Sequence, residues 1–122
     1  MKNQVVWVDI PVTDLDRAID FYAAVLDDRI DRMDAGGVTI GLLPHEQNSS
    51  GGCLYVSEDY PPAPNGPLIY LNVDGRLQPA ANAASRHGGK VIEPPHQIGE
   101  HGWRAIIIDP EGNRIALHSQ TA

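Results

Sequence analysis

Apolar and polar residues alternate near the start of the chain, in the stretch VVWVDIPV. Alternation with a period of two is typical of a strand that buries one face. Trp7 and Asp9 stand on the mixed face of this predicted strand. The apolar face consists of Val6, Val8, Ile10 and Val12.

A helical period follows this strand. Thr13 or Asp14 is suited to cap the helix, because a short oxygen-bearing side chain accepts hydrogen bonds from the free N–H groups of a first turn. The apolar positions at helical spacing are Leu15, Ala18, Ile19, Tyr22 and Leu26. They predict an amphipathic helix of about three turns. Three further strands are predicted in RIDRMD, GVTIGLL and GGCLYVS.

The second half of the chain repeats this pattern. LIYLNV is a strand with Ile69, Leu71 and Val73 on its apolar face. A helix is expected to start near Pro79 and to end at Gly88–Gly89. Its apolar stripe consists of Leu77, Ala80, Ala81 and Ala84. KVIEP, WRAIIID and NRIALHS complete the strands.

The spacing indicates a duplication. Val12 and Val73 each close a strand before a helix, and they lie 61 positions apart in a chain of 122 residues. A repeat of this kind predicts one architecture built twice. We expect a single α+β domain of two βαβββ modules, about 1–58 and 67–122, with a proline-rich linker at about 59–66. The sequence leaves open whether the modules pair within one chain or swap across a dimer.

In each module a helix must cover the apolar face of the sheet. The mixed faces are then expected to curve as half-barrels around a cavity, which the sequence does not define as open or packed shut. The residues predicted to line this ligand pocket are Trp7, Asp9, Leu68, Tyr70, Asn72, Arg114, Ala116 and His118.

Composition narrows the class of protein. The formal charge is −7, and no run of Lys or Arg is present that could follow a phosphate backbone, which argues against nucleic-acid binding. No apolar stretch reaches the roughly twenty residues of a membrane helix, so we expect a soluble, cytoplasmic protein without membrane contact. Cys53 is the one cysteine of the sequence and is interpreted as a small apolar strand residue.

Four motifs in order carry a family resemblance: IPVTDLDRAIDFYAAVLD, LNVDG, GGKVIEPP and DPEGNRIALHS. Together they resemble the vicinal oxygen chelate superfamily, which includes glyoxalase I, extradiol dioxygenases and bleomycin-resistance proteins. The chain is most similar to a group labelled predicted lactoylglutathione lyase-related proteins, which share IGE.G and a final LHS. The resemblance implies a paired βαβββ fold, commonly dimeric, so a homodimer is expected.

The resemblance also implies a divalent metal held by His, Gln or Glu on strands of both modules. Carried over, three ligand positions fall on Trp7, Leu68 and Ala116. None of these side chains offers a lone pair to a cation. A fourth position lies in GGCLYVS, where the sequence leaves Cys53, Tyr55 and Ser57 as alternatives. We therefore expect no metal and no other cofactor.

Other polar side chains are also candidates for metal binding or catalysis. His96, Glu100 and His101 in HQIGEHGW are metal-ligand types, although a solvated loop over the cavity mouth is the favoured interpretation. His118 shares a strand face with Ala116 and is a candidate base or hydrogen-bond partner, with Tyr70 as a second catalytic candidate.

Three functions remain open from the sequence. The leading hypothesis is a metal-less pocket that binds a small organic ligand. The alternatives are an enzyme, either with relocated metal ligands or using His118 with Tyr70 or Asp9 as acid and base, and a non-catalytic interaction module. Whether the protein is an enzyme stays open, although metal-dependent glyoxalase I or dioxygenase activity is not expected.

Overall fold

The structure is a computed structural model that describes residues 3–122. Residues 1–2, at the start of the predicted first module, lie outside the described residues. The first half contains β1 (Trp7–Val12), α1 (Leu15–Leu26), β2 (Asp31–Ala35), β3 (Val38–Leu42) and β4 (Gly51–Val56). The second half contains β5 (Ile69–Asn72), α2 (Leu77–Arg86), β6 (Lys90–Gln97), the 3-10 helix η1 (Gly99–His101), β7 (Trp103–Ile108) and β8 (Arg114–Ser119).

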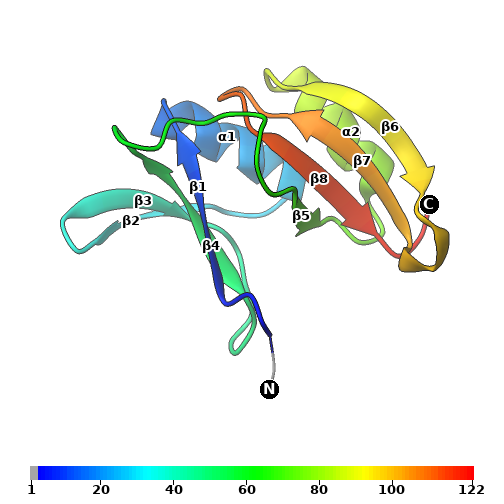
Figure 1. Ribbon diagram of the computed structural model, residues 1–122, viewed down its shortest axis with the longest axis horizontal. Coiled ribbons are helices and arrows are strands. Elements are labelled where there is room, and N and C mark those ends of the chain that lie inside the picture. Colours follow the sequence, from blue (N-terminus) through cyan, green and yellow to red (C-terminus); the bar gives the residue numbers. More distant parts are fainter. Residues whose placement is uncertain (1–2) are drawn as a thin grey trace.

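The two halves have the same topology. Each forms a four-stranded sheet, in the orders β1-β4-β3-β2 and β5-β8-β7-β6. In each sheet the first and last strands of the module pair in parallel, and the other pairs are antiparallel. Figure 1 shows the two sheets next to each other in one molecule. The predicted α+β fold of two βαβββ units is confirmed.

The ends of the helices follow local chemistry. The Asp14 carboxylate accepts a hydrogen bond from the backbone N–H of Arg17 at 3.1 Å, so Asp14 is the predicted N-cap of α1. α2 begins at Leu77, two residues before the predicted start. Pro79 is tolerated there because the first turn of a helix has no intrahelical partner for its N–H groups.

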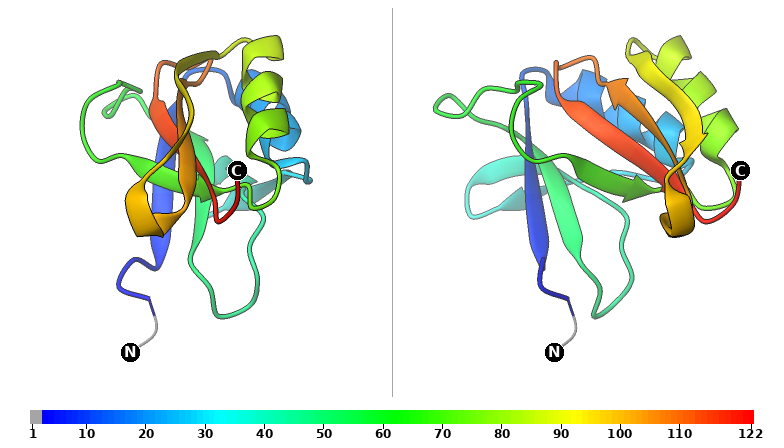
Figure 2. Two further views of the ribbon diagram at one scale, coloured as in Figure 1. Left: turned by 90° about the vertical axis from the view of Figure 1, so that its right-hand side faces the viewer. Right: turned by 45° about the vertical axis from the view of Figure 1, so that its right-hand side comes forward.

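Both helices lie on the same side of the molecule, and the proline-rich linker lies on the opposite side (Figure 2). One continuous hydrophobic core includes residues of both halves, such as Ile10 and Phe21 from the first and Leu77 and Ile107 from the second. The two modules therefore pack against each other within one chain.

Gly89 shows how tight this packing is. A Cβ atom added at Gly89 would lie 2.8 Å from the Phe21 ring and 2.7 Å from the carbonyl oxygen of Ile108. Both distances are shorter than van der Waals contact, so only glycine fits between α1 and the second sheet. The second glycine of the GGKVIEPP motif is thus a packing requirement between the modules.

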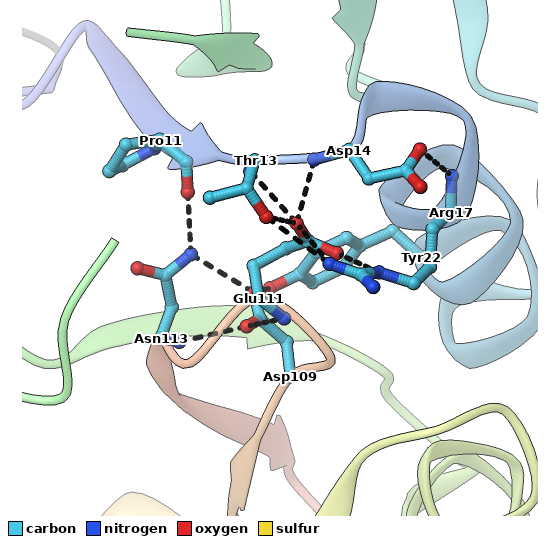
Figure 3. A network of polar contacts seen from close by, with 8 residues as sticks. All are labelled: Pro11, Thr13, Asp14, Arg17, Tyr22, Asp109, Glu111 and Asn113. Carbon is cyan, nitrogen blue, oxygen red and sulfur yellow. Dashed lines mark hydrogen bonds and ion pairs between the residues drawn. The ribbon is translucent and has the colours of Figure 1, made fainter. Parts of the chain in front are cut away.

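A carboxylate from the second module binds the two residues that precede α1, in an arrangement called the Glu111 cap here (Figure 3). Glu111 Oε1 accepts hydrogen bonds from the backbone N–H groups of Thr13 at 2.8 Å and Asp14 at 3.0 Å. Its Oε2 forms an ion pair with Arg17 Nε at 2.7 Å, and its side chain is fully buried. A negative charge at this end of α1 is favoured by the helix dipole.

The turn that presents Glu111 is itself tied down. Asp109 Oδ1 accepts hydrogen bonds from the backbone N–H groups of Glu111 and Asn113, while Asp109 Oδ2 accepts from the Tyr22 hydroxyl at 2.5 Å. Asn113 Nδ2 donates to the Pro11 carbonyl oxygen at 2.7 Å. Gly112 in this turn has φ +102°, a left-handed conformation that favours glycine.

Replacing the capping carboxylate should lower the stability of the whole chain. Glu111→Gln removes the charge opposite Arg17 in a buried site, so the free energy of unfolding should fall by about 2–4 kcal/mol. Urea denaturation at neutral pH measures this loss. The control is Arg29→Gln, which breaks an exposed ion pair with Asp31 and should cost less than about 1 kcal/mol. Equal losses in the two variants would contradict the role given to Glu111.

The contribution of Glu111 should depend on pH. Burial by itself raises the pKa of its carboxyl, but hydrogen bonds from Arg17, Asp14 and Thr13 outweigh burial and lower the pKa from 4.5 to about 2. Because the folded pKa is the lower one, the stabilisation is present in full above pH 4.5 and is lost as the pH falls toward 2. The difference in unfolding free energy between the native chain and Glu111→Gln should shrink across that range. A difference that stays constant down to pH 2 would contradict this.

Candidate functional site

The uncovered sheet faces carry two hollows. The larger hollow, of about 780 Å³, lies on the second sheet and is called the β8 hollow here. The smaller, of about 410 Å³, is lined by β1, the start of β8 and the linker residues Pro61, Ala63, Asn65 and Pro67, and is called the linker hollow.

The predicted pocket residues divide between these hollows. Tyr70, Asn72 and His118 line the β8 hollow. Trp7, Asp9 and Arg114 line the linker hollow. Leu68 and Ala116 line neither of them. Six of the eight predicted pocket residues thus line one or the other of these two hollows.

Ala116 differs most from its predicted environment. It stands opposite Tyr70 on β5 and Ile106 on β7 in the sheet register. Its exposed fraction is 0%. Both neighbours have longer side chains than its methyl group, so Ala116 belongs to the floor of the sheet and not to the surface of a pocket.

A row of polar side chains crosses the second sheet. The register pairs Asn72 with His118, His118 with Arg104, and Arg104 with His96. Neighbours in register point to the same face of a sheet. Four polar groups from β5, β8, β7 and β6 therefore stand side by side on the uncovered face.

Arg104 is held in place from two sides. Its Nε donates a hydrogen bond to His96 Nε2 at 3.2 Å, and its Nη1 donates a short hydrogen bond to the Tyr70 hydroxyl oxygen. His96 in turn donates from Nδ1 to the Pro94 carbonyl oxygen at 2.9 Å. Glu93 Oε1 lies 4.0 Å from Arg104 Nη2, which is too far for a hydrogen bond. The guanidinium is thus oriented by neutral partners and only weakly neutralised.

His118 anchors the loop that closes one end of the β8 hollow. Its Nε2 lies 2.5 Å from the His101 carbonyl oxygen. A carbonyl only accepts, so Nε2 carries the proton in this contact. Gly102 follows with φ +97°, and a Cβ there would lie 2.5 Å from the Ser119 carbonyl oxygen. Glycine therefore lets η1 pass close against the end of β8.

The end of β8 also ties down the turn before α2. The Ser119 hydroxyl is fully buried, accepts from the Gly75 N–H at 2.9 Å and donates to Asp74 Oδ1 at 3.2 Å. Asp74 Oδ1 also accepts from the Gln120 N–H at 2.6 Å. The LNVDG and LHS motifs thus meet at one edge of the hollow.

On the uncovered face of the first sheet, the polar side chains form hydrogen bonds with each other. Asp9 Oδ1 accepts hydrogen bonds from Trp7 Nε1 at 2.8 Å and from the Cys53 thiol at 3.3 Å. Burial, together with the bond to Asp9, raises the pKa of the Cys53 thiol to about 11. The thiol therefore stays protonated at neutral pH, which agrees with its interpretation as an inert strand residue.

The sheet register relates one of the three alternatives for the fourth ligand position that the resemblance implies to Ala116. Asp9 and Tyr70 are equivalent under the repeat; Asp9 pairs with Cys53 and Tyr70 pairs with Ala116. Cys53 is therefore the counterpart of Ala116. Tyr55 lies two residues further along β4, opposite Pro11, and Ser57 lies beyond the end of that strand.

The residues at these positions do not fit a metal ion. Trp7 is a hydrogen-bond donor only, Leu68 and Ala116 are apolar, and the Cys53 thiol keeps its proton. Nor do three side chains of His, Cys, Asp or Glu gather anywhere in residues 3–122 in a way that could hold a metal.

The proposed alternative cluster is also dispersed. His96 lies on β6 rather than in a loop, because that strand continues to Gln97 across two register shifts. Glu100 and His101 lie in η1, which borders the β8 hollow through His101. The expectation of a loop at the mouth of a pocket holds for η1 and is wrong for His96.

Arg104 was missed from the sequence. In WRAIIID it alternates with the buried Ala105 and Ile107. The DPEGN hairpin pairs Ile108 with Arg114, and counting back along both strands pairs Arg104 with His118. That count was the available signal.

Among residues 3–122, no helix is long and apolar enough to cross a bilayer.

The fold and the site define a class: paired βαβββ modules with uncovered sheet faces. A sequence model of the Glyoxalase/Bleomycin resistance protein/Dioxygenase superfamily matches residues 4–117. The chain belongs to this superfamily, and the resemblance seen in its motifs is confirmed.

Individual relatives agree with this assignment. The chain is 32% identical over 108 residues to proteins of Mycobacterium tuberculosis and Mycobacterium bovis that are named "Putative glyoxylase CFP32". The match covers 88% of this chain and 40% of those proteins, so the chain spans less than half the length of these curated relatives.

Solved structures show the same fold. A glyoxalase/bleomycin resistance protein from Albidiferax ferrireducens superposes with a TM-score of 0.76 at 18% identity, covering 96% of this chain and 98% of that one. A glyoxalase I mutant from Zea mays superposes with a TM-score of 0.70 at 21% identity, covering 94% of this chain and 46% of that one.

Proposed function

We propose that the protein binds a small organic molecule in the β8 hollow, and that binding does not depend on a divalent metal. One observation carries this proposal. The four positions that correspond to the family's metal ligands hold Trp7, Cys53, Leu68 and Ala116, whereas the ordered polar side chains gather on the second sheet around Arg104 and His118.

The hollow has the mixed lining that small-molecule sites use. Its volume of about 780 Å³ falls in the range of about 300–1,000 Å³ typical of such sites. Ile98 and the Tyr70 ring supply apolar surface, and Arg104 and His118 supply hydrogen-bonding groups in fixed positions. Fixed polar groups among apolar walls favour binding because little side-chain freedom is lost.

Binding without metal should be detectable by thermal shift. In the presence of EDTA, a library of small aromatic and polar compounds should contain ligands that raise the melting temperature, because a ligand of the folded state stabilises it by mass action. His118→Ala should remove the shift, since it releases η1 from the hollow. The matched control is His87→Ala, which alters an exposed histidine at the end of α2.

Two results would count against this proposal. One is a library without any ligand whose effect is lost in His118→Ala. The other is a stoichiometric metal ion in the purified protein, measured by mass spectrometry of the metals, with His118 among its ligands.

We further propose that the protein forms a homodimer through the uncovered face of the first sheet. Trp7, Met33 and Val38 share that face and are 45%, 44% and 49% exposed. Exposed apolar side chains grouped on one sheet face are typical of surfaces that contact another protein. The family resemblance to commonly dimeric proteins supports a second copy as the partner.

The molar mass in solution tests this association. Light scattering during size-exclusion chromatography should give the mass of two chains, and the double change Met33→Glu with Val38→Glu should give one, because buried unpaired charges oppose association. Val56→Glu is the control: Val56 is 48% exposed but stands on the other face of the sheet. A native chain that elutes with the mass of one copy would contradict the dimer.

A further inference from the structure

The β8 hollow contains a cation whose hydrogen-bonding capacity is only partly used. Of the five N–H donors of an arginine, Arg104 uses Nε toward His96 and one on Nη1 toward the Tyr70 hydroxyl. The second N–H of Nη1 and both on Nη2 form no hydrogen bond with the rest of residues 3–122. At least one N–H of Nη1 and one of Nη2 remain available, which is the number that a forked pair with a carboxylate needs.

Nearby acidic groups do not replace a ligand. The Glu93 carboxylate stands 4.0 Å from Nη2 and its side chain is 49% exposed, so water screens the pair. Asp74 also lines the hollow, but its Oδ1 is engaged by Ser119 and Gln120. The Arg104 side chain is 25% exposed, which leaves it accessible while it is shielded from bulk solvent.

The surroundings of Arg104 also restrict the orientation of its guanidinium group. The Tyr70 ring lies beside the guanidinium, with 5.9 Å between Arg104 Cζ and the ring centroid. These contacts fix the plane of the guanidinium. Because the partners are neutral, they do not cancel its positive charge. A planar, pre-oriented guanidinium recognises a carboxylate through two parallel hydrogen bonds.

Resting on the proposed function of the β8 hollow, we infer that its ligand is an organic carboxylate, bound by Nη1 and Nη2 of Arg104 with its apolar part against the Tyr70 ring and Ile98. His96 and the Tyr70 hydroxyl are positioning groups in this arrangement, because both hold Arg104, whereas the Tyr70 ring contacts the ligand. The net charge of −7 does not attract anions over long distances. Recognition of a carboxylate therefore depends on the Arg104 guanidinium at short range and not on the net charge of the protein.

The test compares two probes of the same shape, benzoate and the neutral benzamide. Titrations of ¹⁵N-labelled protein in EDTA, followed by NMR, should show benzoate perturbing the Nε–H signal of Arg104 and the amides of β7 and β8. Benzoate should bind more tightly than benzamide by about tenfold or more, since a hydrogen bond to a charged group contributes about 1.5–3 kcal/mol.

Four variants assign the effect to Arg104. Arg104→Met should weaken benzoate binding to the level of benzamide, and Arg104→Lys should fall between, because lysine keeps the charge without the fork. Arg114→Met is the matched control: it removes the same charge from the same sheet, but Arg114 lines the linker hollow. It should leave benzoate binding unchanged. Tyr70→Phe should weaken benzoate and leave benzamide unaffected, as expected of a positioning residue.

The outcomes separate this inference from the proposed function. If both probes perturb the hollow equally and Arg104→Met has no effect, the hollow binds small molecules but the carboxylate inference is wrong. If Arg114→Met weakens benzoate as much as Arg104→Met does, general electrostatics explains the preference and the inference is again wrong. If benzoate perturbs no signal of the hollow, the inference fails, and the compound library decides the proposed function separately.

Discussion

The buried carboxylate of Glu111 is the contact on which the relation between the two modules depends. It replaces water at the N–H groups of Thr13 and Asp14, just before α1, and it does so from a position 94 residues further along the chain than Arg17. The hydrogen bonds of Asp109 and Asn113 hold that turn in shape, so the cap and its support form one unit. Because the cap fixes α1 relative to β7 and β8, it also fixes which sheet faces stay uncovered.

Much of the fold followed from short-range patterns. Period-two alternation located β1 and β5, and the spacing between Val12 and Val73 revealed the repeat that both sheets then display. Pro110 and Gly112, which have strong local preferences for turns, stand in the turn that joins β7 to β8. The start of α2 was misplaced because Arg76 caps it without a side-chain hydrogen bond, so no residue marks that boundary.

The site was less accessible from the sequence. Counting across the β7–β8 hairpin would have placed Arg104 opposite His118, since both strands are regular there. The bond from Arg104 to Tyr70 joins strands that are 34 positions apart, and His96 reaches Arg104 only after two irregularities in the β6–β7 register. Neither contact has a local signal. The division of the cavity likewise depends on where the linker crosses, which its prolines do not specify.

The close approach at Gly89 has a consequence for how copies of this chain assemble. Phe21 of the first module sits where a side chain at Gly89 of the second would be, and the Glu111 cap lies between the same two halves. Exchange of modules between two folded chains would have to expose this aromatic ring and this carboxylate together before any replacement contact forms. Burial of this ring and of this charged group within one chain therefore opposes such an exchange.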